Sequence, residues 1–221
     1  MADIFIRAAT RLWRVIEARS NAVDGAFHRL RQPVTRPVSR FFIKLHINQS
    51  VVTFLRFLMV IAFLPLWIYE HYYLAVLLLA LNVFLDILDG DLARVLQQDS
   101  EIRKFEDVSV DNLVVVLLAL ALIGGGFVSG LVGAYYIFIA TLSWWFSVVR
   151  RNQERRSAWL FHAQASSLLF LLRFCVVTIL MFVYAFFQVD IFSFTLIVLS
   201  VILTLSALYD YWKITRARTS S

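Results

Sequence analysis

Residues Val51–Leu88 read VVTFLRFLMVIAFLPLWIYEHYYLAVLLLALNVFLDIL, and this stretch decides the fold class. It contains two apolar runs, Val51–Tyr69 and Tyr72–Leu88, which are separated only by Glu70 and His71. Each run is close to the ~20 residues that an α-helix needs to cross the hydrocarbon core of a membrane. Two such runs in succession are typical of a membrane protein that crosses the bilayer several times.

The rest of the chain continues this pattern. Of its 221 residues, 61% are hydrophobic and 16% are charged, against roughly 45–50% and 25% in soluble domains. Four further apolar runs are Asp107–Ile123, Leu131–Val149, Ser167–Phe187 and Ile191–Trp212. Gly124-Gly125-Gly126 is a helix-stop signal after the third run. We therefore predict an all-α membrane protein with six transmembrane helices. The single cysteine, Cys175, lies in an apolar run and cannot form an intramolecular disulfide.

Basic residues set the orientation of the helices. Lys and Arg precede the first run, follow the sixth, and occupy the loops between runs two and three and between runs four and five. The other three loops contain neither residue. Because positive residues are retained on the cytoplasmic side, we expect both termini in the cytoplasm and the protein in a bacterial inner membrane.

The first 48 residues do not form a span. Apolar residues of the N-terminal segment share one helical face and arginines share another: Phe5, Ala9, Leu12 and Ile16 against Arg7, Arg11 and Arg14. This favours a cytoplasmic amphipathic juxtamembrane helix on an anionic leaflet, although a disordered basic tail is the alternative. Pro33 and Pro37 are expected to break any helix before the first span. The expected division is 1–48 interfacial segment, 49–215 membrane domain and 216–221 tail.

Four aspartates are the main candidates for a functional site. Asp86 and Asp89 are three residues apart at the end of the second run, and Asp107 and Asp111 are four apart at the start of the third. Each pair therefore shares a helix face. Asp86 and Asp111 lie about 13–14 residues from the outer ends of their spans, or roughly 20 Å. Antiparallel helices would therefore bring all four carboxylates to one depth. Acids at membrane depth indicate function.

Clustered carboxylates need a positive charge among them. No Lys or Arg lies on the two helix faces that carry the acids. Hard divalent cations prefer oxygen ligands, so we expect one or two Mg²⁺ or Mn²⁺ ions. Gly90 leaves room for a ligand beside the acids, and Arg94, about one turn further on, can bind a phosphate.

A longer motif surrounds these residues. Asp86-Ile87-Leu88-Asp89-Gly90-Asp91-Leu92-Ala93-Arg94 is followed, after eight residues, by Arg103, then at four-residue intervals by Asp107 and Asp111. This resembles the signature of the CDP-alcohol phosphatidyltransferases, D-x2-D-G-x2-A-R, seven or eight residues, G-x3-D-x3-D, at seven of eight fixed positions. A weaker resemblance, to P-N-x-x-T-x-x-R, keeps Thr53 and Arg56. With the helix arrangement of the family included, the resemblance covers about residues 33–215, and the aspartate motif is its specific part.

The resemblance implies both an architecture and a reaction. It implies six membrane helices, an amphipathic N-terminal segment and a homodimer. It also implies transfer of a phosphatidyl or similar phospho-alcohol group from a CDP-linked lipid donor to an alcohol, with release of CMP. The implied metal ligands are Asp86, Asp89, Asp107 and Asp111, with Asp111 also the general base. The implied nucleotide-binding residues are Gly90, Ala93, Arg94, Thr53, Arg56 and Arg103.

Arg103 stands where the family has glycine. An arginine there can crowd the cytidine or reach the diphosphate. We expect it to turn outward towards the interface, or to contact the diphosphate, because a cation gains nothing against a neutral base.

The acceptor is suggested by basic residues near the fourth and fifth runs. Arg150, Arg151, Arg155 and Arg156 follow the fourth run, and Arg173 lies inside the fifth. A buried arginine needs a counter-charge, which a phosphate or an aspartate can supply. We therefore expect Arg150, Arg151 and Arg173 to bind a phosphorylated acceptor, such as glycerol 3-phosphate or an inositol phosphate.

Two other classes of function stay open. A catalytically inactive relative would act as a membrane scaffold, and Arg103 keeps this alternative open. An ion-binding transporter is disfavoured, because the sequence shows no inverted repeat and no pair of helices broken by Gly or Pro. The expected partners are the CDP-linked lipid, the acceptor alcohol and membrane lipids, with no nucleic acid.

Overall fold

The computed structural model describes residues 37–44, 49–96, 101–154 and 174–219, and every regular element within these ranges is a helix. After a short helical segment at 37–44, the helices are α2 (Gln49–Ile68), α3 (Tyr72–Leu96), α4 (Glu101–Gly124), α5 (Gly130–Glu154), α7 (Val176–Phe187) and α8 (Phe192–Thr219). The prediction of an all-α protein is therefore confirmed for the described residues.

Four of these helices are long and apolar enough to cross a membrane, over Ser50–Ile68, Tyr72–Asp89, Gly130–Arg150 and Phe192–Arg216. The chain is thus an integral membrane protein. The apolar parts of α4 and α7 are shorter, Ser109–Gly124 and Val176–Phe187. The fifth predicted span, Ser167–Phe187, falls partly outside the described residues. The count of six spans and the orientation of the termini therefore stay predictions.

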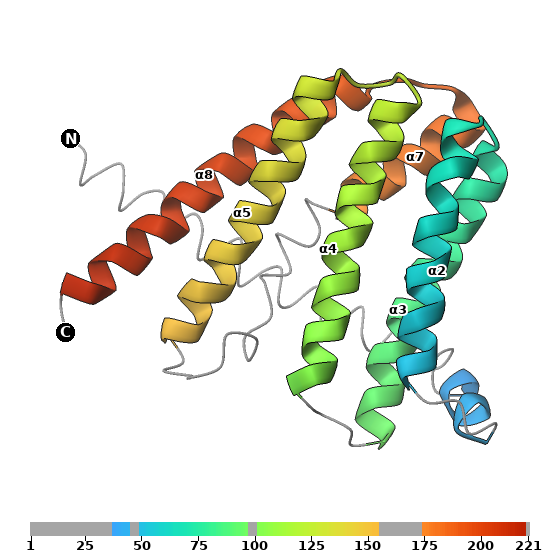
Figure 1. The fold of residues 1–221 in the computed structure, drawn as a ribbon, viewed down its shortest axis with the longest axis horizontal. Helices are drawn as coiled ribbons and strands as arrows, with labels where there is room; N and C mark the ends of the chain where they lie inside the picture. Colours follow the sequence, from blue (N-terminus) through green and yellow to red (C-terminus); the bar gives the residue numbers. More distant parts are fainter. Residues whose placement is uncertain (1–36, 45–48, 97–100, 155–173, 220–221) are drawn as a thin grey trace.

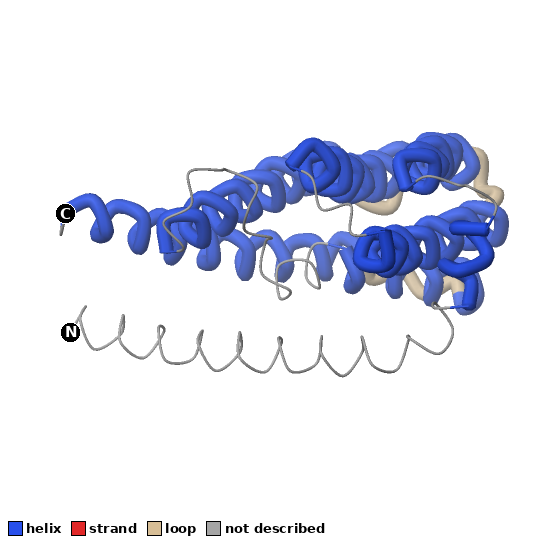
Figure 2. Tube along the Cα trace, turned by 90° about the horizontal axis from the view of Figure 1, so that it is seen from below, coloured by secondary structure: helices blue, strands red, loops and turns tan. Residues whose placement is uncertain are grey.

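The helices are arranged in two layers. Figures 1 and 2 show α2, α4 and α5 in one layer and α3, α7 and α8 in the other. Across the layers α2 packs on α3 and α5 packs on α8, while within the first layer α4 contacts both α2 and α5. Helix α4 therefore connects a unit built on α2 and α3 with a unit built on α5 and α8.

The short turns lie together at one end of the molecule (Figure 1). Helix α4 ends at Gly124, as the triple glycine predicts. Gly126 has a φ of 79°, and the N–H of Phe127 donates to the carbonyl of Leu122 at 3.0 Å. This left-handed residue followed by a bond back across the last turn is a common helix C-terminus, and glycine adopts it without steric cost.

At the opposite end, α3 and α4 continue beyond their apolar runs. Helix α3 reaches Leu96 and α4 begins at Glu101. The whole acidic motif therefore lies on two helices, joined through residues 97–100. Polar residues can continue a helix in this way once it leaves the hydrocarbon core, because water can solvate their side chains.

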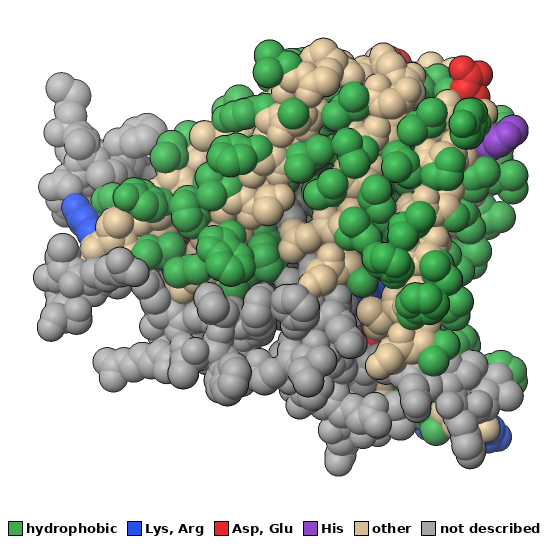
Figure 3. All heavy atoms as spheres, in the orientation of Figure 1, with side chains coloured by type: hydrophobic (Ala, Val, Ile, Leu, Met, Phe, Trp, Pro, Cys, Tyr) green, Lys and Arg blue, Asp and Glu red, His purple; other side chains and the backbone are tan. Residues whose placement is uncertain are grey.

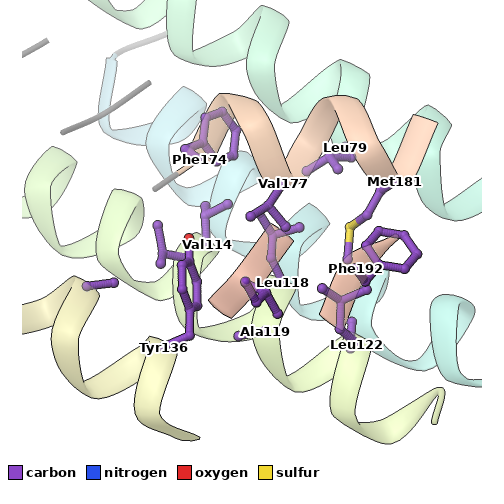
Figure 4. Close-up of a cluster of buried hydrophobic side chains, with 14 of the residues drawn as sticks. Leu79, Val114, Leu118, Ala119, Leu122, Tyr136, Phe174, Val177, Met181 and Phe192 are labelled. Carbon is purple, nitrogen blue, oxygen red and sulfur yellow. The ribbon is translucent and has the colours of Figure 1, made fainter. Parts of the chain in front are cut away.

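The core lies between the two layers. Buried side chains from α3, α4, α7 and α8 point towards one another there, including Leu79, Leu118, Leu122, Met181 and Phe192 (Figure 4). The outer surface is also mostly hydrophobic over the middle of the described helices (Figure 3). Apolar residues both inside and outside are expected of helices that face lipid.

A smaller apolar cluster covers the end of α2 and α3. Val52 on α2 and Leu85, Leu88 and Leu92 on α3 are buried, and Val38, Phe42 and Ile43 of the 37–44 segment pack on them. Pro37 is the first described residue of this helical segment, so the prediction that Pro33 and Pro37 break a preceding helix stays a prediction. Pro33 and the predicted amphipathic helix lie outside the described residues.

Candidate active site

Three helices meet at the acidic motif. Asp86 and Asp89 lie on α3, Asp111 lies on α4, and α2 contacts both helices. From α2, Arg56 places Nη2 at 2.6 Å from Asp86 Oδ1 and at 2.8 Å from Asp111 Oδ1. Its Nη1 lies 3.6 Å from Asp89 Oδ2. One guanidinium therefore joins three carboxylates from two other helices.

Arg56 supplies a positive charge that the clustered carboxylates need. Among the described residues, the positive charge beside the acids comes from a third helix, α2. The Arg56 side chain is 1% exposed, at a depth where an unpaired charge costs several kcal/mol. Ion pairs with short N–H···O contacts are what make such burial tolerable. The structure thus places Arg56 within the acidic cluster itself, whereas the sequence suggested a role in nucleotide binding.

Two polar neighbours hold this arrangement. Thr53, one turn before Arg56, donates its hydroxyl to Asp89 Oδ2 at 2.7 Å. The Asn82 side-chain amide donates to the backbone carbonyl of Arg56 at 3.0 Å. Asn82 was missed in the sequence, although a lone amide in an apolar span, four residues before Asp86, is a usable signal. Thr53 and Asn82 therefore fix the position of α2 against α3 at the cluster.

The cluster is buried on one side and open on the other. Asp89 is 2% exposed, whereas the side chains of Asp86 and Asp111 are 30% and 37% exposed. A ligand can therefore approach Asp86 and Asp111, while Asp89 is held inside by Thr53 and Arg56. The three acids reach the same guanidinium, which is consistent with the prediction that they lie at a common depth.

For the remaining motif residues, the structure shows only which helix carries each of them. Gly90, Ala93 and Arg94 lie on α3, and Arg103 and Asp107 lie on α4, but their side chains are outside the described set. Arg151 is on α5 with its side chain likewise undescribed, and Arg173 lies outside the described residues. Their predicted roles stay predictions.

The described carboxylate oxygens are ligands of the type that hard cations prefer. Asp86 and Asp111 direct carboxylate oxygens to one point, and Asp89 lies beside them. Mg²⁺ and Mn²⁺ prefer such oxygen ligands. No group of three or more potential metal-ligating side chains is recognised among the described residues, and Asp107, one turn before Asp111, is the motif acid that this set omits.

Arg150 lies apart from the cluster, between α5 and α8. Its Nε is 2.7 Å from Asp210 Oδ1, and the two side chains are 7% and 1% exposed. The ring of Tyr209 lies 6.0 Å from the guanidinium carbon. The sequence predicted a phosphate or an aspartate as the counter-charge of a buried arginine, and for Arg150 the structure supplies an aspartate. Asp210 had not been recognised as this partner.

Comparison with known proteins identifies the family. A family model described as CDP-alcohol phosphatidyltransferase matches residues 48–206, which is well over half of the chain and includes all residues of the acidic cluster. Neither the search of the curated proteins nor the search of the solved structures found a match. The sequence motif, the convergence of its aspartates and the family match agree, and the chain therefore belongs to the CDP-alcohol phosphatidyltransferase family.

Proposed function

We propose that this chain transfers a phosphatidyl or similar phospho-alcohol group from a CDP-linked lipid donor to an acceptor alcohol, with release of CMP. Family membership supports phosphotransfer from a CDP-alcohol in phospholipid synthesis. The observation that carries the proposal is the meeting of Asp86, Asp89 and Asp111, from two helices, around one positive charge inside an apolar protein.

Asp111 is the proposed general base. The acceptor hydroxyl gives its proton to the Asp111 carboxylate, its oxygen forms a bond to phosphorus, and the bond from phosphorus to the CMP oxygen breaks. Asp111 suits this role because its side chain is 37% exposed. Asp89 does not, because it is 2% exposed and accepts a hydrogen bond from Thr53.

Metal binding is the second part of the proposal. Family members generally use a divalent metal, and Asp86, Asp89, Asp107 and Asp111 would hold one or two Mg²⁺ or Mn²⁺ ions. When bound, such an ion offsets the charge of the diphosphate and of the departing CMP. The carboxylates of this chain contribute by converging from α3 and α4 before any substrate arrives, so that little rearrangement is needed.

The nucleotide is proposed to bind beside the cluster. Gly90, Ala93 and Arg94 continue α3 directly after Asp89, and Arg103 lies one turn before Asp107 on α4. The glycine leaves space for the nucleotide, and the arginines can pair with the diphosphate. Thr53 and Arg56 complete this side from α2.

The acceptor is proposed to be phosphorylated, as glycerol 3-phosphate or an inositol phosphate. The proposal relies on Arg151 and Arg173 more than on Arg150, because Asp210 already neutralises Arg150 in the structure. If Arg173→Ala leaves the apparent acceptor affinity unchanged, Arg173 is a structural counter-ion and this part of the proposal fails.

The setting of the reaction is proposed from the sequence. Both termini lie in the cytoplasm of a bacterium, the protein resides in the inner membrane, and two copies form a homodimer. Asp86, Asp111 and Arg56 lie in the half of their helices away from the short turns, which fits a site reached from the basic, cytoplasmic side.

Release of CMP from purified protein tests the proposal. The donor is CDP-diacylglycerol, and a panel of acceptor alcohols is screened with Mg²⁺, with Mn²⁺ and with EDTA. We expect metal-dependent CMP release with at least one acceptor, and its loss in Asp111→Asn. Asp190→Asn is the matched control, because Asp190 lies in the exposed turn before α8 and asparagine can still accept the bond from Phe192 N–H. Absence of CMP release with every acceptor favours the scaffold alternative.

A further inference from the structure

We propose that Arg56 is an internal counter-ion that competes with a divalent cation for the same carboxylate oxygens. Metal binding then releases the Arg56 side chain, which becomes available to the diphosphate of the donor. This inference rests on the proposed function, since it concerns the metal and nucleotide that the site takes.

The first argument is geometric. Asp86 Oδ1 and Asp111 Oδ1 lie 2.6 and 2.8 Å from the same nitrogen, Arg56 Nη2. A metal bonded to both oxygens would stand about 2.0–2.1 Å from each, which is the region that Nη2 fills. The nitrogen and the ion exclude each other, so the guanidinium has to withdraw when these two oxygens bind a metal.

The second argument concerns charge. Three carboxylates face one guanidinium in the described cluster. Hard divalent cations prefer carboxylate oxygens, so the same residues that pair with Arg56 are also suited to bind a metal. The same guanidinium makes metal binding less favourable, because each ion pair that it forms with a carboxylate must be broken when the metal binds. Arg56 therefore sets how tightly the metal binds, and it also stabilises the three-helix junction at low metal concentration.

The third argument concerns the range of motion. The backbone of Arg56 is held by Asn82, and Thr53, on the same face of α2, is bonded to Asp89. The backbone is therefore anchored, and release affects only the long side chain of Arg56. A freed guanidinium remains charged and seeks another anion. The carboxylates on the open side of the cluster are where a diphosphate would arrive, so metal and donor should bind with positive coupling.

The test measures Mn²⁺ binding directly, by electron paramagnetic resonance of free Mn²⁺ during titration of the full chain in detergent. Arg56→Gln removes the charge, and Arg56→Lys keeps it but cannot bridge three carboxylates. We expect the apparent Kd of Arg56→Gln to fall by at least about tenfold, and that of Arg56→Lys to fall less, because the competing cation is lost or weakened. Arg216→Gln is the control, because Arg216 lies on α8 over the ring of Trp212, outside the cluster, and its Mn²⁺ affinity should not change.

A second measurement guards against misfolding of a variant. In EDTA, Arg56→Gln should melt at a lower temperature than wild type. Adding Mn²⁺ should raise the melting temperature of the variant more than that of wild type, because the ion replaces the lost charge. An unchanged or weaker Mn²⁺ affinity in both Arg56 variants overturns the competition while leaving the proposed function intact. Wild-type protein that binds no Mn²⁺ overturns the competition together with the metal part of the proposed function, and absence of CMP release with every acceptor overturns the proposed function itself.

Discussion

The ion pair between Arg150 and Asp210 predicts how strongly α5 and α8 are held together. The perturbation is a set of three variants: Arg150→Met, Asp210→Leu and the double variant. Each single change leaves one charge buried without its partner, while the double change replaces the pair with apolar side chains of similar length. The comparison therefore separates the cost of an orphaned charge from the worth of the pair.

The magnitude follows from the geometry. Unit charges 2.7 Å apart attract by about 6 kcal/mol at an effective dielectric constant of about 20. Because the side chains are only 7% and 1% exposed, much of this attraction offsets the loss of hydration. Removing one partner of such a pair costs about 3–5 kcal/mol, whereas replacing both by apolar residues is often neutral or stabilising. We expect about 3–5 kcal/mol for each single variant and a double variant within about 1 kcal/mol of wild type.

The assay is equilibrium unfolding by SDS in mixed micelles, followed by tryptophan fluorescence. The free energies give the coupling between the two residues from a double-mutant cycle. Two results would refute the reasoning. One is a single variant that loses less than about 1 kcal/mol, and the other is a double variant as unstable as the sum of the singles. Either would mean that the pair is hydrated in the membrane protein and does not hold the helices.

Further predictions concern topology and the site. Cysteines introduced at Ser129 and Ser220 should label from opposite sides of the membrane, and labelling of Ser220 from outside contradicts the six-span topology. Asp89→Asn should abolish CMP release while Asp91→Asn keeps most of it, because Asp91 projects away from the Asp86–Asp89 face; equal losses would show that the face is wrongly assigned. Arg103→Gly should change the apparent donor affinity by no more than about tenfold, or 1.4 kcal/mol. If wild type is inactive and Arg103→Gly restores turnover, Arg103 is a blocking residue.

Local signals predicted the helices well. The apolar runs predicted the apolar ends of α2, α3, α5 and α8 to within a few residues, and the triple glycine predicted where α4 ends. The polar ends of α3 and α4 were missed, because hydropathy follows the membrane core and not the helix.

The site was predictable only in part. The spacing of Asp86, Asp89 and Asp111 indicated a shared depth, because it depends on helix geometry alone. That Arg56 joins them depends on how α2 packs against α3 and α4, and no pattern along one helix contains this information. Asp210 is a similar case, since it lies 60 residues from Arg150 in the sequence and beyond the range matched by the family model.

The small apolar cluster at the end of α2 and α3 has a mechanical consequence. Leu85, Leu88 and Leu92 fix one stripe of α3 against Val52 and the 37–44 segment, and the adjacent stripe is fixed by the pairing of Asp86 and Asp89 with Arg56. With two adjoining stripes held, α3 cannot rotate about its axis without breaking one of them. Transmembrane helices tilt when bilayer thickness changes. Here such tilting should carry α2, α3 and the 37–44 segment as one body, so the spacing of the charges is insulated from the thickness of the surrounding lipid.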